Sequence, residues 1–180
     1  IGRVARAPME TGYLPGDIVA VAPYGECGVC NLCRMGAGEL CRQKPYFLKG
    51  AFAQQVEVPL GFVDKGVVKL PAPDAAYTLC EPLACVLCGM EKCDIKPESR
   101  GLIVGGGPMG VLFALVLQHC GNEAVIVEPV AERRGFAEKI GVPAVAPGAA
   151  DISTFDRVVI AVNRADLVDE YVMNVADKGI

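Results

Sequence analysis

Hydrophobic positions follow two different patterns along this chain, and the pattern changes near residue 73. Before that point, short apolar stretches rich in β-branched residues alternate with Pro-Gly and other turn signals, as in residues 14–21. From residue 100 onward, nearly continuous apolar runs alternate with stretches of helix-forming residues. The first pattern predicts β-structure joined by turns. The second predicts a parallel sheet with helices on both faces.

The first part of the chain is expected to hold strands at residues 2–4 and 17–21. Apolar and polar residues alternate over 50–58, which predicts a half-buried strand. The β pattern then continues over 62–63 and 67–70.

The second part is expected to begin with a helix over 77–90, in which Pro82 is tolerated only in the first turn. Four strands and three helices then alternate. The strands are expected at 101–104, 124–128, 144–146 and 155–162, and the helices at 109–119, 131–140 and 166–176. We therefore predict an α/β fold with a β-rich domain portion over 1–73, a connecting helical segment over 74–99, and a parallel-sheet domain portion over 100–180.

Composition narrows the class of protein. The chain has 180 residues, of which 52% are hydrophobic, so a sizeable core can form and disorder is not expected. A net charge of −4 without a long basic cluster argues against nucleic acid as the main partner. The longest apolar run, residues 111–117, is far shorter than the roughly 20 residues of a membrane span. With no signal peptide visible, a cytoplasmic setting is expected.

Nine cysteines are many for such a chain, and four of them cluster as Cys27, Cys30, Cys33 and Cys41. Their close spacing, with Gly28 among them, suits a loop that wraps four thiolates around one ion. A tetrahedral zinc site with four sulfur ligands has no open coordination position, so this site is expected to be structural.

Two other interpretations of the clustered cysteines are weaker. A disulfide framework would leave one of nine cysteines unpaired, and the Gly-rich, apolar composition is typical of an intracellular α/β domain. An iron–sulfur cluster usually has its fourth cysteine three residues after the third and then a proline. Here Cys41 comes later and Arg42 follows.

A second group of cysteines, Cys80, Cys85, Cys88 and Cys93, lies in or just after the predicted helix. A helix would place these side chains at widely different angles, so they would not converge on a second metal ion. We expect them to be small, buried core residues. Glu81, at the start of the same helix, is either a first-turn acid favoured by the helix dipole or a functional carboxylate.

A glycine-rich turn, Gly105-x-Gly107-x-x-Gly110, lies between a predicted strand and a predicted helix. Glycines in this order let the chain turn sharply and let backbone N–H groups approach a pyrophosphate at the helix N-terminus. An acid, Glu128, closes the next strand, 18 residues after Gly110. Such an acid accepts hydrogen bonds from the adenosine ribose and repels a phosphate, so NAD is expected over NADP.

One observation and one alternative interpretation bear on the prediction of a NAD site. Arg133 and Arg134 follow the acid closely, and an arginine can also hold a 2′-phosphate. A glycine turn without any ligand is the plain alternative, which the strand, the helix and the acid around the motif disfavour.

Several motifs together resemble the zinc-containing medium-chain alcohol/polyol dehydrogenases, with the sorbitol and threonine dehydrogenase branch most similar. They are Gly16-Asp-Ile-Val19, the four-cysteine lobe, Gly50-Ala-Phe-Ala53, Glu81-Pro-Leu-Ala84 and Gly105-Gly-Gly-Pro-Met-Gly110. The resemblance covers essentially the whole chain. It implies a GroES-like catalytic domain followed by a Rossmann dinucleotide-binding domain, each present in part.

The resemblance also implies roles for particular residues. The four clustered cysteines would hold a structural Zn²⁺, and Glu81 would lie at or beside a catalytic zinc ion. The residues that would bind NAD are Gly105, Gly107, Pro108, Met109 and Gly110 at the pyrophosphate, Glu128 and Arg133 at the adenosine ribose, and Ala161 and Val162 on the adenine side.

The implied reaction is hydride transfer from a secondary alcohol or polyol to NAD, in an enzyme that is a homodimer or homotetramer. In this family a cysteine and a Gly-His-Glu motif supply the principal catalytic zinc ligands, and they are expected upstream of Ile1. The rest of the Rossmann sheet is expected after Ile180. We therefore expect the chain as given to lack turnover.

Two other functions remain open at this point. A non-enzymatic NAD(H)-binding sensor or scaffold would keep only the structural zinc. A quinone-reductase-like NAD(P)H oxidoreductase would lack both zinc ions, and the intact four-cysteine lobe disfavours it. A catalytic zinc ion in the whole protein would separate the dehydrogenase from both.

Overall fold

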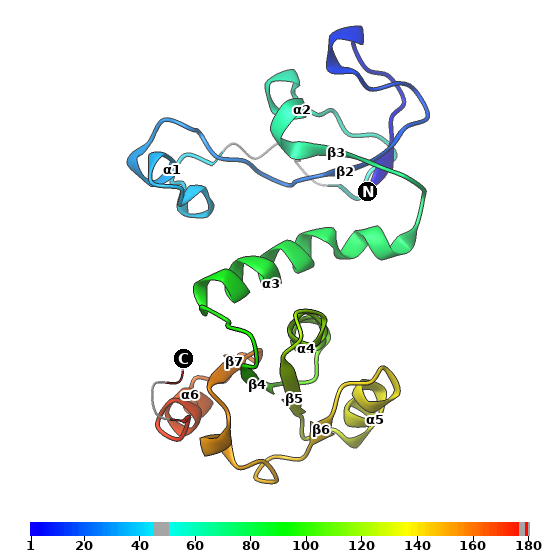
Figure 1. Ribbon diagram of the computed structural model, residues 1–180. Coiled ribbons are helices and arrows are strands. Elements are labelled where there is room, and N and C mark those ends of the chain that lie inside the picture. Colours follow the sequence, from blue (N-terminus) through cyan, green and yellow to red (C-terminus); the bar gives the residue numbers. More distant parts are fainter. Residues whose placement is uncertain (45–50, 177–178, 180) are drawn as a thin grey trace. The chain divides into compact units, whose positions relative to one another are not determined.

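The computed structural model describes residues 1–44, 51–176 and 179. Its internal contacts divide the chain into two compact units, Ile1–Glu81 and Pro82–Ile180. Figure 1 shows the helices and strands of both units.

The first unit is built on a three-stranded antiparallel sheet. Strand β2 (Ile18–Val21) is central and pairs on one side with β1 (Gly2–Arg3) and on the other with β3 (Val67–Leu70). Val19, in the middle of β2, is buried and lies opposite Lys69 in the register. These strands confirm the β-structure predicted for both ends of this part of the chain.

The described part of the first unit also contains short helical segments. The α-helices are α1 (Asn31–Arg34) and α2 (Leu60–Gly66). Single turns of 3-10 helix lie at Met9–Thr11, Gly38–Leu40 and Ala75–Leu79.

Two sequence predictions fail in this unit. Residues 51–58 form no strand, and Gly50 lies outside the described residues. The side chains of 51–57 are all exposed, with Phe52 fully so, and an alternating pattern gives a strand only where another element covers its apolar face. The β pattern expected at 62–63 is also wrong, because these residues belong to α2, whose buried side includes Phe62, Val63 and Gly66.

The second unit contains a four-stranded parallel sheet, as the sequence predicts. The strands are β4 (Arg100–Val104), β5 (Glu123–Val127), β6 (Ala144–Val145) and β7 (Arg157–Ile160). Their order in the sheet is β6-β5-β4-β7, so the first strand in sequence lies inside the sheet and the chain crosses over to reach β7 (Figure 1).

Helices connect and cover these strands. They are α3 (Cys80–Lys92), which runs from the end of the first unit into the second, α4 (Pro108–His119), α5 (Ala131–Lys139) and α6 (Asp166–Val172), with a 3-10 turn at Ile152–Thr154. Helix α6 ends earlier than the predicted residue 176.

Both faces of the sheet are buried, because successive strand residues point to opposite sides. Ile103 of β4 packs in a core with Val86 of α3 and Leu117 of α4. Leu102, one position earlier, packs in a second core that contains Tyr171 of α6. The sheet is thus covered by helices on both sides, which confirms the predicted α/β class.

The cysteines in and directly after α3 depart from expectation. Cys80 and Cys85 are exposed, and Cys88 and Cys93 are only partly buried, so the prediction of buried core cysteines is wrong. Helix α3 buries the side that carries Val86 instead, which leaves the thiols on its other sides. All nine cysteines lie in the described part of the chain, and none forms a disulfide.

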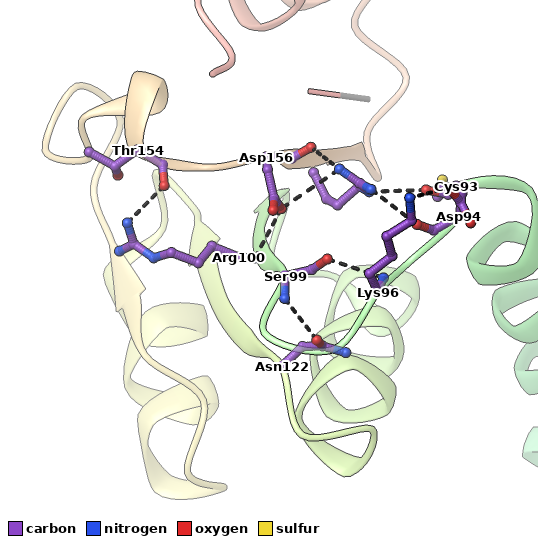
Figure 2. A network of polar contacts seen from close by, with 9 residues as sticks. Cys93, Asp94, Lys96, Ser99, Arg100, Asn122, Thr154 and Asp156 are labelled. Carbon is purple, nitrogen blue, oxygen red and sulfur yellow. Dashed lines mark hydrogen bonds and ion pairs between the residues drawn. The ribbon is translucent and has the colours of Figure 1, made fainter. Parts of the chain in front are cut away.

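A polar network closes the amino ends of the parallel strands (Figure 2). The N–H of Ser99 donates to Oδ1 of Asn122 at 3.0 Å, and the N–H of Arg100 donates to Oδ1 of Asp156 at 3.0 Å. The side chain of Arg100 also donates to the carbonyl oxygen of Thr154 at 2.7 Å. These bonds join the starts of β4, β5 and β7, at the end of the sheet opposite the carboxyl edge where α/β folds bind ligands.

Candidate functional site

Four thiols of the first unit come together in the loop that follows β2. The Sγ atoms of Cys27, Cys30, Cys33 and Cys41 all lie within 4.8 Å of one another. The Sγ of Cys33 is 3.8 Å from that of Cys27 and 3.4 Å from that of Cys30, and the Sγ of Cys30 is 4.0 Å from that of Cys41.

The local chain explains why the four thiols converge. Gly28 and Gly36 adopt φ angles of 73° and 76°, which favour glycine, and they bend the chain on either side of helix α1. The first three cysteines therefore lie on one tight loop. The short 3-10 turn Gly38–Leu40 then brings in Cys41, which is buried.

Two thiols of the cluster, Cys27 and Cys33, differ in how readily they lose a proton. Backbone N–H groups of Val29 and Cys30 donate to the sulfur of Cys27 and lower the pKa of Cys27 from 9.0 to about 6. Burial, followed by the Cys30 thiol, raises the pKa of Cys33 to about 12. The first negative charge of the cluster therefore resides on Cys27, and a bound cation would favour ionisation of the remaining thiols.

The arrangement fits a single tetrahedral metal ion. With Zn–S bonds of about 2.3 Å, the sulfur atoms of a tetrahedral site stand about 3.8 Å apart. The three Sγ–Sγ distances of 3.4 Å, 3.8 Å and 4.0 Å lie on both sides of this value. The same distances leave too little room for a cluster of several iron and sulfide ions between the thiols, so the iron–sulfur alternative is disfavoured.

A tight turn follows β4 in the second unit and leads directly into α4. Gly105 adopts a φ angle of 110°, and a Cβ there would stand 2.5 Å from Cγ1 of Val162 and 3.3 Å from the carbonyl oxygen of Ala161. Gly110 faces the carbonyl oxygen of Gly105 so closely that a Cβ would overlap it. These two glycines are therefore required by the packing of the turn against its neighbours.

Gly107 differs from these two glycines. It is the N-cap of α4, and a Cβ built on it would meet nothing within 4 Å, so the space in front of it is open. Pro108 and Met109 follow in the first helical turn, where N–H groups have no partner within the helix and the dipole attracts anions. This end of α4 has the properties of a phosphate-binding turn.

Glu128 lies directly after β5 and is only 2% exposed. Its Oε2 accepts a hydrogen bond of 2.7 Å from the N–H of Gly106, and its Oε1 accepts one of 2.9 Å from the N–H of Val130. A Cβ on Gly106 would stand 3.0 Å from Cγ of Glu128. The carboxylate therefore joins the turn after β4 to the turn after β5.

The two arginines near Glu128 have different surroundings. Arg134 donates from one terminal nitrogen to the carbonyl oxygens of Glu128 and Pro129, at 2.7 Å and 2.8 Å, and so fixes the backbone of this turn. Arg133 lies 3.8 Å from Oε2 of Glu128, and its side chain is 60% exposed. Arg133 is the arginine that extends from this turn into solvent.

Ala161 and Val162 follow the end of β7 and form the wall behind the glycine turn. The N–H of Ala161 donates to the carbonyl oxygen of Val104 at 2.9 Å, which continues the pairing of β7 with β4 beyond the strand. The structure thus brings the predicted cofactor residues of the second unit together at the carboxyl edge of its sheet. Glu81 lies apart from them in sequence, in the first turn of α3, where its side chain is exposed.

Sequence reasoning missed Gly106 and Arg134 as part of this site. Gly106 occupies a variable position of the glycine motif, and its contact with Glu128 spans 22 residues. Its place in the middle of three consecutive glycines was the one available signal. Arg134 was noted only as a possible phosphate ligand, whereas its hydrogen bonds go to the backbone.

Within the part of the chain that the structure describes, none of the helices has the length and apolar character needed to cross a bilayer.

Comparison with known proteins places these features in a family, although no protein-family model matches the chain. The D-altritol 5-dehydrogenase of Agrobacterium fabrum is 34% identical, over 99% of this chain and 56% of that protein. The 2-dehydro-3-deoxy-L-galactonate 5-dehydrogenase of Pseudoalteromonas atlantica is 30% identical, over 88% of this chain and 47% of that protein. The chain therefore spans about half the length of these curated relatives.

A solved structure shares the fold. The zinc-binding dehydrogenase of Sinorhizobium meliloti 1021, determined with NADP bound, matches with a TM-score of 0.87 and 27% identity, over 99% of this chain and 57% of that one. The two units thus have the GroES-like and Rossmann-type folds of zinc-binding dehydrogenases. Sorbitol and L-threonine dehydrogenases are among the further relatives of this chain. The chain belongs to the zinc-type medium-chain alcohol/polyol dehydrogenase family.

Proposed function

We propose that the protein to which this chain belongs oxidises a secondary alcohol of the polyol type and uses NAD as the hydride acceptor. The polyol and sugar-acid dehydrogenases among its relatives support this reaction. The observation that carries the proposal is the open turn at Gly107 and the N-terminus of α4, with the carboxylate of Glu128 buried beside it. This combination supports a dinucleotide site at the carboxyl edge of the parallel sheet.

Each part of the turn has a proposed role in holding the cofactor. Gly105 and Gly110 allow the sharp bend and the close approach of α4 to the sheet, and Gly107 leaves room for the pyrophosphate. Pro108 begins the helix without needing an N–H partner, and the N–H of Met109 would face the phosphate. Ala161 and Val162 would border the adenine side.

The cofactor preference is proposed from charge. Glu128 carries a negative charge at the position where the adenosine ribose is expected, which favours the ribose hydroxyls of NAD over the phosphate of NADP. Arg133 extends into solvent beside it and would contact the same ribose. The structural relative from Sinorhizobium meliloti holds NADP, so the preference needs a direct measurement.

Zinc has two proposed roles. Cys27, Cys30, Cys33 and Cys41 would hold a structural ion that ties down their loop and leaves no open coordination position. When bound, a catalytic zinc ion supplies Lewis acidity toward the alcohol oxygen, and NAD supplies the hydride acceptor. Glu81, in the first turn of α3, would contribute a negative charge at or beside that ion. A cytoplasmic homodimer or homotetramer is proposed from the family resemblance.

Two measurements test the proposal. The 180-residue chain should bind NADH, seen as a change in nicotinamide fluorescence, and should contain one zinc ion held by the four cysteines, without turning over polyols. The whole protein should contain a second, catalytic zinc ion and reduce NAD in the presence of a polyol. A whole protein that binds NADH with the structural zinc alone and oxidises no alcohol would instead be a sensor or scaffold.

A further inference from the structure

The buried carboxylate of Glu128 has more hydrogen bonds within the protein than contact with a ribose requires. Both of its oxygens accept backbone N–H groups, from Gly106 at 2.7 Å and from Val130 at 2.9 Å. Its side chain is only 3% exposed. A carboxylate that served ribose hydroxyls alone would keep its oxygens open to solvent before the cofactor arrives.

We propose that Glu128 is a positioning residue for the phosphate end of the cofactor, because it holds the glycine turn in its binding shape through the N–H of Gly106. This inference rests on the proposed cofactor function and adds a second role to the charge at the ribose. It extends the influence of Glu128 to a part of the ligand that its side chain does not touch.

The geometry of the turn fixes the direction of the Gly106 N–H. Gly105 is held at a φ angle of 110°, and Gly106 has a carboxylate directly against it, so the direction of the Gly106 N–H is fixed from outside the turn. Gly107, the next residue, is the N-cap of α4. A bond that fixes Gly106 therefore also fixes where the first N–H groups of α4 point.

The hydrogen bond from Gly106 to Glu128 is stronger than one between neutral groups. An ionised acceptor makes hydrogen bonds roughly twice as strong as neutral ones, and burial strengthens them further. The cationic group near this carboxylate is Arg133, whose terminal nitrogen lies 3.8 Å from Oε2 and extends into solvent. Arg133 therefore does not replace Gly106 as the partner of Oε2.

The two roles of Glu128 predict different ligand dependence. If Glu128 acts only at the adenosine ribose, its loss affects only ligands that contain adenosine. If it positions the turn, its loss also weakens a ligand that has a phosphate and no adenosine. Reduced nicotinamide mononucleotide is such a ligand, and its fluorescence allows direct titration.

The experiment titrates NADH and reduced nicotinamide mononucleotide into the 180-residue chain and its variants. Glu128→Gln removes the charge and turns an amide N–H toward backbone donors, so affinity for both ligands should fall by about tenfold, the effect of one charge-assisted hydrogen bond. Glu128→Asp keeps the charge but shortens the reach to Gly106, and should give the same loss for the mononucleotide. Far-UV circular dichroism reports that each variant is folded.

Glu123→Gln is the matched control. It removes the same charge from the other end of β5, where Glu123 is exposed and pairs with Arg100 at 2.6 Å, and it should leave both affinities unchanged. Unchanged mononucleotide affinity in both Glu128 variants, with NADH weakened, would overturn the positioning role and leave the cofactor site standing. A wild-type chain that binds neither ligand would overturn the proposed cofactor function and this inference with it.

Discussion

The carbonyl oxygen of Gly105 lies where the first side-chain atom of any other residue at position 110 would stand. Gly110 is in the first turn of α4 and Gly105 directly follows β4, so this contact sets how closely the helix approaches the sheet. Both partners are backbone, and neither can turn aside as a flexible side chain can.

Gly110→Ala should therefore damage the fold of the second unit. The added methyl group must push α4 away from the turn, at a cost of about 3 kcal/mol in the free energy of unfolding. Chemical denaturation followed by far-UV circular dichroism measures this change, and NADH titration should show weakened binding in the same variant.

Gly107→Ala is the companion change with the opposite profile. Its φ of −77° suits any residue and its Cβ would meet nothing within 4 Å, so the free energy of unfolding should stay within about 0.5 kcal/mol of wild type. The methyl group would occupy the space proposed for the pyrophosphate, so NADH affinity should fall. Unchanged NADH affinity would argue against a phosphate at this turn.

Sequence reasoning succeeded where the determining interactions are local. The strand, turn and helix around Gly105–Gly110 follow from apolar residues, glycines and a proline that are adjacent in the chain. The cysteine cluster is similar, because three of its members lie within seven residues and a loop alone brings them together.

The failures occurred where burial depends on distant parts of the chain. Alternation over 50–58 is the correct pattern for a strand, but in the described part of the chain residues 51–57 are exposed and no element covers them. Cys85 was expected in the core because it is small, whereas the side of α3 that is buried is set by its packing against Ile103 and Leu117. The partner of Glu128 was missed because Gly106 is 22 residues away.

Cys41→Ser should abolish zinc binding in the four-cysteine lobe. Cys41 is the buried ligand, and a serine hydroxyl is a poor substitute for a thiolate on zinc. Zinc content measured by atomic emission should fall from one ion per chain to background. Cys120→Ser is the control, because Cys120 is exposed in the second unit, and it should retain the zinc.

Acid should release the same zinc ion, because ligand thiolates must be deprotonated to bind.

In the metal-free chain, Cys27 should ionise first, with a pKa of about 6, and should be the cysteine of the cluster that iodoacetamide modifies fastest at neutral pH. Peptide mapping by mass spectrometry identifies the modified residue. Zinc should protect all four thiols equally, whereas preferential modification of Cys33 in the metal-free protein would be inconsistent with the charge residing on Cys27.

The ion pair of Asp17 and Lys69 should make the first unit sensitive to acid. Lys69 lies 2.7 Å from the carboxylate, and together with the N–H of Leu14 it lowers the pKa of Asp17 below its usual value. A lowered pKa in the folded state means that this stabilisation is present above about pH 4 and is lost as the pH falls through the lower value. In Asp17→Asn, thermal unfolding midpoints should therefore depend less on pH in this range than in wild type.

Substitution of Arg157 should lower the stability of the second unit. Its side chain is 10% exposed, and its guanidinium donates at 3.0 Å to the carbonyl oxygens of Cys93 and Asp94, which follow the end of α3. Arg157→Met removes the donor from these two partly buried carbonyls, so the free energy of unfolding should fall by about 2 kcal/mol. Hydrogen exchange of residues 80–92 should accelerate at the same time, because the end of α3 loses its connection to β7.

Arg164→Met provides the comparison for Arg157. Arg164 pairs with Asp166, and its side chain is 62% exposed. An exposed pair contributes little to stability because water and salt screen it. The expected change is below about 0.5 kcal/mol. Equal losses in the two variants would mean that charge alone, rather than the hydrogen bonds to the carbonyls after α3, determines the effect, and α3 would then not depend on Arg157 for its attachment to the sheet.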